Sequence, residues 1–188
     1  MIDAAERALL DEGVEAVSVR RLASELGASR QVVYTHFGGM HDVFEAVHRR
    51  AGVALTASVA DLTAPIGSDE RIVDGAHAYV EHARQRPAVF DLMFGRPVPG
   101  YVPSEATTEE LRRAFRVGVV GLVAEWARAN DQDLSPRDAV ARARVYWSSI
   151  HGLVTLERAG HARPDETDAL IDSLMAALLA GWRAIGSA

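Results

Sequence analysis

The sequence predicts an all-α protein, and two observations carry this prediction. Every segment with clear hydrophobic periodicity in the 188-residue chain repeats at the three-to-four-residue spacing of a helix face, and none alternates as a strand does. Glycine, proline and capping residues separate about nine such segments. With 48% hydrophobic residues, the chain can also bury a sizeable core.

The first expected helix spans about residues 2–12, with Ile2, Ala5 and Leu9 on its inner face. It ends at Gly13, because glycine accepts the positive φ that commonly follows a helix.

A tight pair of short helices is expected at residues 18–37, SVRRLASELGASRQVVYTHF. Ser18 can cap the first helix and Ser29 the second, because their side-chain oxygens can accept hydrogen bonds from free backbone N–H groups. Only Gly27 and Ala28 separate the two helices. This arrangement predicts a helix-turn-helix, whose second helix enters the major groove of DNA.

Six further helices are expected downstream, and several of them are opened or closed by clear signals. Ser135-Pro136, for example, provides a cap followed by proline at the first helical position. Residues 95–104 contain three prolines and two glycines, which favours a loop. The expected helices cover about residues 40–62, 69–86, 87–94, 107–130, 136–159 and 164–185.

Composition excludes several classes of protein. The chain has no cysteine, so disulfides, thiolate metal sites and cysteine nucleophiles are excluded. The longest apolar run, residues 174–182, is too short to cross a membrane, and acidic residues stand where a signal peptide needs positive charge. We therefore expect a soluble, cytoplasmic protein with no membrane partner.

Charge and site chemistry favour a local binding surface over an enzyme. The net charge of −6 argues against general nucleic-acid binding, but residues 18–37 carry three arginines against one glutamate. No Ser-His-Asp spacing, glycine-rich phosphate loop or carboxylate pair stands out, so no enzyme is expected. The histidines are poorly spaced for metal ligation, and neither a metal site nor a cofactor is expected.

Two motifs carry a resemblance to a known family. Gly13, SVRRLA at 18–23, Gly27, Ser29 and YTHF at 34–37 resemble the DNA-binding domain of TetR-type transcriptional regulators. Trp147, His151 and Gly152 resemble a Trp-x-x-x-His-Gly signature in the C-terminal domain of one TetR subgroup. The resemblance implies a helix-turn-helix domain at residues 1–47. A connector helix would join it to an effector-binding and dimerisation domain at residues 48–188.

The expected DNA contacts lie on and around the second helix of the pair. Val33 and Phe37 should point into the core, whereas Arg, Gln, Val and Thr on the outer face suit base edges. The resemblance implies that Tyr34 and His36 contact phosphate. The full set of expected contacts is Ser18, Arg20, Ser29, Arg30, Gln31, Val32, Tyr34, Thr35 and His36. TetR-type regulators often carry a phosphate-binding Lys where this chain has Met40, so that contact is lost or is partly replaced by backbone N–H groups.

The last two helices each carry an apolar stripe that needs burial. Two such helices can pair with two from a second chain, and a TetR-type homodimer uses this four-helix arrangement. The expected interface consists of Val140, Ile150, Val154, Ile171, Leu174, Leu178 and Trp182. The alternative is that these stripes are buried wholly within one subunit.

Large side chains gather in the middle of the chain. Apolar walls with a few polar groups are typical of a ligand pocket, and we expect a small organic, largely apolar effector. The candidate pocket residues are Tyr79, His82, Phe90, Met93, Phe94, Phe115, Leu122, Trp126, Trp147 and His151. For each single residue, ordinary core packing is the alternative.

Taken together, these features predict a homodimeric TetR-type repressor that a small effector releases from double-stranded operator DNA. The alternative is a helical small-molecule-binding or scaffolding protein that no longer reads DNA. Met40 and the net charge of −6 favour that alternative.

Overall fold

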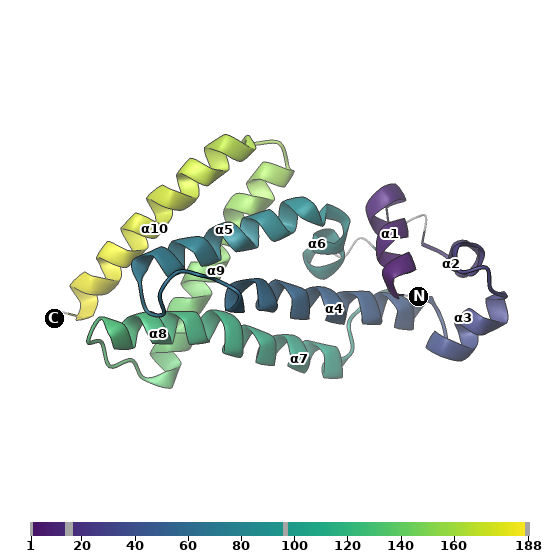
Figure 1. Cartoon of the computed structure of the whole chain (residues 1–188), viewed down its shortest axis with the longest axis horizontal. Helices are drawn as coiled ribbons and strands as arrows, with labels where there is room; N and C mark the ends of the chain where they lie inside the picture. The colour runs from purple at the N-terminus through teal and green to yellow at the C-terminus, as the bar shows by residue number, and fades with distance from the viewer. Residues whose placement is uncertain (1, 14–16, 96–97, 187–188) are drawn as a thin grey trace. The chain divides into compact units, whose positions relative to one another are not determined.

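The computed structural model describes residues 2–13, 17–95 and 98–186, and within these residues every regular element is helical (Figure 1). The expected all-α fold class is therefore confirmed. The elements in chain order are α1 (Ile2–Glu12), α2 (Val19–Glu25), α3 (Arg30–Phe37), α4 (Met40–Ala60), α5 (Asp69–Gln85), α6 (Pro87–Phe94), α7 (Glu105–Phe115), the π-helical segment η2 (Arg116–Val120), α8 (Gly121–Ala129), α9 (Pro136–Arg158) and α10 (Pro164–Gly186).

The main departure from the expected helices falls within residues 107–130. Here α7, η2 and α8 follow one another without a break, so the described residues form nine continuous helices with one π-helical insertion. The helix also starts earlier than expected, because Oγ of Ser104 accepts from the backbone N–H of Thr107 at 3.1 Å. The insertion has the sequence RVGVV, in which glycine and β-branched residues are poor α-helix formers.

The chain divides into two compact units. Unit 1 comprises residues 1–54 and 84–112, and unit 2 comprises residues 55–83 and 113–188. Unit 1 extends beyond residues 1–47, because α6 packs against α1 and Tyr101 packs against α4, and the functional division at residue 47 stays a prediction. The sequence motifs gave no sign of these long-range contacts.

Unit 1 has a core of small and medium apolar side chains. It is built from Ala4, Ala5, Ala8, Leu9, Val17, Leu22, Ala23, Val33, Val43, Phe44, Val47, Ala51, Val89, Leu92 and Tyr101. A polar network joins residues 101–104 to α4, since Tyr101 donates to Glu45 at 3.3 Å and lies 3.2 Å from Nδ1 of the buried His48. Glu45 also accepts from the backbone N–H of Ser104 at 3.0 Å. The loop at 98–104 is thereby fastened to the middle of α4.

Unit 2 is organised around the antiparallel pair α9 and α10 (Figure 1). Its fully buried side chains include Ile72, Val123, Trp126, Ile150, Ile171 and Met175. The ring centroids of Trp126 and Trp182 lie 5.2 Å apart, and the indole N–H of Trp126 donates to Asp69 at 2.7 Å. Arg183 donates to both oxygens of the same carboxylate, at 2.6 and 2.7 Å. The bond to Asp69 gives the buried indole N–H of Trp126 its acceptor, and Arg183 balances the charge of that carboxylate.

No helix in the described part of the chain is both long enough and apolar enough to cross a membrane.

Candidate nucleic-acid interface and effector pocket

The turn between α2 and α3 is built much as its sequence predicts. Oγ of Ser18 accepts from the backbone N–H of Arg21 at 3.2 Å and caps α2. Gly27 follows with φ of 60°, a conformation that other residues adopt only at a cost. Ser29 has the extended backbone of a cap residue, but its side chain makes no capping bond. Its hydroxyl is therefore not committed to the start of α3.

Helix α3 places one side chain firmly inside and most of the others outside. Val33 is completely buried, and Phe37 is partly buried against the core of unit 1. The exposed side chains are Arg30, Gln31, Val32, Tyr34, Thr35 and His36, and they match the expected outer face. The hydroxyl of Thr35 donates to the carbonyl of Gln31 within the same helix, at 2.8 Å. The outer face of α3 is therefore polar and partly aromatic, and the buried Val33 holds the helix to the core of unit 1.

Positive charge is uncovered around this face. Two acids flank α3 at equal distance in sequence. Asp42 lies 3.8 Å from Nδ1 of His41, and Glu25 is held by Arg7 at 3.0 Å and by Arg21 at 3.9 Å. Arg20 and Arg30 are exposed and have no acidic partner within the described residues. Because both acids have partners of their own, these two guanidinium groups are available to phosphate or base edges.

Met40 occupies the first position of α4 and is not a surface residue. Its side chain is partly buried and packs against the core of unit 1. It therefore has a packing role and does not replace a cation. The free N–H groups in the first turn of α4 are the donors that remain in this region.

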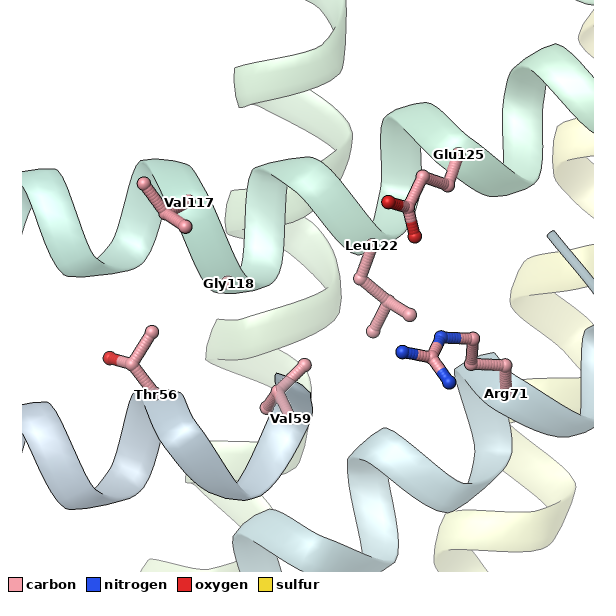
Figure 2. Close-up of a pocket in the computed structure, with 7 residues that line it drawn as sticks. All are labelled: Thr56, Val59, Arg71, Val117, Gly118, Leu122 and Glu125. Atoms are coloured by element: carbon pink, nitrogen blue, oxygen red, sulfur yellow. The ribbon is translucent and has the colours of Figure 1, made fainter. Parts of the chain in front are cut away.

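Within unit 2, a cavity of about 250 Å³ lies beside the π-helical segment (Figure 2). Gly118 allows the close approach of α4 here, because a Cβ at this position would lie 2.6 Å from Cγ2 of Thr56. The lining residues come from α4, α5, η2 and α8, and they are Thr56, Val59, Arg71, Val117, Gly118, Leu122 and Glu125. π-Helical turns occur frequently at functional sites. The cavity is therefore the candidate effector site.

Only Leu122 among the expected pocket residues lines this cavity. Trp126 is a buried core residue whose indole N–H donates to Asp69. Phe90, Met93 and Phe94 belong to unit 1, where Phe90 packs on Phe94 with ring centroids 4.8 Å apart. All three lie on α6, which packs against α1, and the pocket role of these four residues stays a prediction.

The other expected pocket residues belong to unit 2, and four of them form a cluster away from the lining of the cavity. The hydroxyl of Tyr79 bonds Nδ1 of His151 at 2.8 Å, and Trp147 packs against both His151 and Phe115. Burial lowers the pKa of His151 and raises that of Tyr79. His82 lies on α5 and is partly buried. Neutral, hydrogen-bonded groups of this kind stabilise a core as readily as they orient a ligand.

The expected interface residues divide into two groups. Ile150, Val154, Ile171 and Trp182 are buried inside unit 2, so little of their surface remains for a partner to cover. Their part in a dimer interface stays a prediction. Val140, Leu174 and Leu178 remain partly exposed. Beside them lie aliphatic side chains that the sequence pattern did not single out, namely Val145, Leu156, Leu170 and Ile185, all exposed.

Within the described ranges, no group of three or more His, Asp or Glu side chains is placed to hold a metal ion.

Comparison with known proteins gives the family. A family described as "Bacterial regulatory proteins, tetR family" matches residues 1–47, and "Tetracyclin repressor-like, C-terminal domain" matches residues 72–178. An uncharacterized HTH-type transcriptional regulator of Mycobacterium tuberculosis is 24% identical over 170 residues, which cover 90% of this chain and 74% of that protein.

Solved structures share the fold. A protein of unknown function from Rhodococcus sp. RHA1 is 26% identical, with a TM-score of 0.79 over 96% of this chain and 92% of that chain. A TetR variant from Acinetobacter baumannii AYE in complex with minocycline is 17% identical, with a TM-score of 0.65 over 100% of this chain and 96% of that chain. The chain therefore belongs to the TetR family of DNA-binding transcriptional regulators, which are not enzymes.

Proposed function

We propose that this protein is a homodimeric repressor that binds operator DNA through α3 and is released from it by a small organic effector. The observation that carries the proposal is the outward face of α3, where six exposed side chains surround the buried Val33. Arg30 and Gln31 suit guanine and adenine edges, and the methyl groups of Val32 suit thymine. In this proposal Tyr34 and His36 contact phosphate, together with Ser18, Arg20, Ser29 and Thr35.

A dimer is needed because one α3 helix reads only a half-site. Two recognition helices must lie about 34–36 Å apart to enter successive major grooves on one side of the duplex. The exposed faces of α9 and α10 support such a dimer. On α9, Val145, Gly152 and Leu156 share one face, and on α10, Leu174, Leu178 and Ile185 do so.

Small residues would let the helices of two subunits approach closely. Gly152 on α9 and Gly181 on α10 are both exposed, and a Cβ built at either would meet no atom within 4 Å. We therefore propose that the interface consists of the exposed aliphatic and glycine positions of α9 and α10. Of the interface residues expected from the sequence, this proposal keeps Val140, Leu174 and Leu178.

Release by an effector follows from the position of α4. This helix begins at Met40, three residues after α3 ends, and its later residues Thr56 and Val59 line the cavity of unit 2. A ligand that fits the cavity better in one orientation of α4 shifts the equilibrium by its differential affinity for the two states. The apolar lining from Val59, Val117 and Leu122 supports an effector with an apolar body.

Binding to DNA from the promoter of its own gene tests the proposal. Fluorescence anisotropy with a labelled promoter fragment, repeated at increasing salt, should show tight, sequence-specific binding that weakens with salt. Random DNA of the same length is the control. Equal affinity for both fragments would favour a helical ligand-binding protein that no longer reads DNA.

The sign of regulation needs a second measurement. Expression of a reporter gene behind the same promoter should rise when the gene for this protein is deleted. A fall would identify an activator and overturn the repressor assignment while leaving DNA binding intact.

A further inference from the structure

The cavity of unit 2 has an apolar end and a charged end. Val59, Val117 and the methyl group of Thr56 lie at one end, and Arg71 and Glu125 reach toward the other, with Leu122 between them (Figure 2). Gly118, Leu122 and Glu125 are spaced four and three residues apart, so they follow one face of the continuous η2–α8 helix. A ligand that fills this space must therefore present an apolar body and a polar head.

The two charged side chains at the polar end of the cavity do not pair with each other. Arg71 and Glu125 form no ion pair, and within the described residues the side chain of Glu125 has no hydrogen-bonding partner. Both side chains are partly buried. A ligand that covered them without compensating their charges would leave two desolvated, unpaired ions, which is costly.

Arg71 is held in place before any ligand arrives. Its Nη1 group donates to the carbonyl oxygens of Leu62 and Ala64, the latter at 2.9 Å, and so is fixed to the segment between α4 and α5. Its Nη2 group makes no hydrogen bond within the described residues. A carboxylate can accept from this group, and a preorganised partner loses less entropy on binding.

The signs of these charges select among ligands. A simple carboxylic acid would pair with Arg71 but bring a like charge toward Glu125. A simple amine would pair with Glu125 but be repelled by Arg71. Like charges placed together are a common device for rejecting the wrong ligand. A molecule with an anion and a cation on neighbouring atoms satisfies both residues.

The size of the cavity limits the ligand further. About 250 Å³ is slightly below the range of about 300–1,000 Å³ typical of sites for drug-sized molecules. We propose that the effector is a small zwitterion with a short aliphatic body, of the class of the aliphatic α-amino acids, whose carboxylate binds Arg71 and whose ammonium binds Glu125. This assignment rests on the proposed function for its regulatory meaning, but binding itself can be measured without DNA.

Isothermal titration calorimetry on the full chain tests the assignment, with L-leucine and L-valine as probes. The comparison ligands are 4-methylpentanoate, which lacks the amine of leucine, and 3-methylbutylamine, which lacks its carboxylate. We expect at least one amino acid to bind, with L-leucine bound at least about tenfold more tightly than either analogue, equivalent to a difference of one power of ten in Kd.

Substitutions of Glu125 and Arg71 then test which charged group of the ligand each residue binds. Glu125→Gln should weaken leucine binding at least about tenfold while leaving or improving the affinity for 4-methylpentanoate, because the repelling charge is gone. Arg71→Lys should weaken the binding of both carboxylates, since lysine lacks the fixed, planar donors by which the guanidinium holds Leu62 and Ala64 and still points a donor elsewhere. Glu70→Gln and Arg128→Lys change exposed residues outside the cavity and should alter neither affinity.

Three outcomes would overturn the assignment: no binding of either amino acid up to about 10 mM, equal binding of leucine and its analogues, or unchanged leucine affinity in Glu125→Gln. The last variant keeps the test decisive even if Arg71→Lys does not fold, because Glu125 makes no bond that the fold needs. Operator binding is measured separately. Failure here with intact operator binding removes only the ligand class, whereas loss of operator binding with intact leucine binding removes only the DNA-reading function.

Discussion

Two exposed surfaces of this molecule differ in chemistry, and the difference indicates what each one binds. The outer face of α3 carries Arg, Gln, Tyr, Thr and His side chains around a buried valine. The outer faces of α9 and α10 carry valine, leucine and isoleucine between glycines. Polar donors suit phosphates and base edges, whereas an aliphatic face needs an apolar partner. Exposure alone therefore does not identify a binding surface; its chemistry does.

The largest expected effect comes from placing a charge on the aliphatic face. Val145 is 50% exposed, so Val145→Asp should leave the isolated subunit folded. In a dimer the carboxylate would be buried without a partner. We expect monomers in sedimentation velocity, and operator affinity reduced by about a hundredfold or more because only one half-site can be held.

Leu178→Asp should have the same effect as Val145→Asp. The control is Ile66→Asp, which places the same charge on an exposed aliphatic residue outside α9 and α10. If both interface variants remain dimers, the subunit contact does not lie on this aliphatic face, and the proposed difference in function between the two surfaces is wrong.

The second prediction compares the inside and outside of α3. Val33 is completely buried, so Val33→Ala should destabilise the protein by about 2 kcal/mol through lost burial and the resulting cavity. Its neighbour Val32 is exposed, and Val32→Ala should change stability by less than about 0.5 kcal/mol. Urea denaturation measures both. Equal losses in the two variants would mean that α3 is not anchored through Val33.

The third prediction concerns the outer face of α3 alone. Tyr34→Ala and His36→Ala should each weaken operator binding about five- to tenfold, which is about 1–1.4 kcal/mol, because each removes a contact with the DNA backbone. Their melting temperatures should match that of the unmodified protein, since both side chains are exposed. Val53→Ala, an exposed change on α4, serves as the control in the same anisotropy titration. Unchanged affinity in both α3 variants would remove this face as the DNA surface.

The helix-turn-helix could be predicted residue by residue because its signals are local. Ser18 caps α2 and Gly27 takes the positive φ of the turn, and the inward position of Val33 follows from helical spacing. Ser29 has the backbone of a cap residue but makes no capping bond. The all-α fold followed from the same short-range rules.

Helices α9 and α10 show what these short-range sequence rules do not predict. Periodicity indicates that a face is apolar, but it does not say what covers that face. Ile150 and Ile171 are covered within the chain, whereas Val145 and Leu170, on other faces of the same two helices, are not. Both helices are apolar around much of their circumference, so the choice depends on packing between helices.

The cavity could not be predicted because it depends on residues brought together from four elements. Arg71 and Glu125 are unremarkable in sequence, and their unpaired state exists only in the fold. One local signal was present. The segment RVGVVG at 116–121 places glycines and β-branched residues inside an expected helix, which marks a weak point where a π-helical turn forms.

The smallest expected effect concerns the pH dependence of stability, through one buried or partly buried histidine in each unit. Burial lowers the pKa of His48 in unit 1 and of His151 in unit 2 below the ordinary value of 6.5. The unfolded chain therefore binds protons more readily than the folded one, so this stability is complete above about pH 6.5 and is lost as pH falls through the folded values.

The free energy of unfolding, measured by urea at pH 7, 6 and 5, should decrease toward pH 5. Three carboxylates have depressed pKa values, Asp3, Glu45 and Asp69, whose ordinary values are 3.8, 4.5 and 3.8, because the hydrogen bonds they accept outweigh the opposing effect of burial. Their contribution is lost at lower pH, so the chosen window isolates the histidines. His48→Gln and His151→Gln should each reduce the pH dependence. If neither buried variant reduces it, the two histidines are not the groups that couple proton binding to the stability of the units.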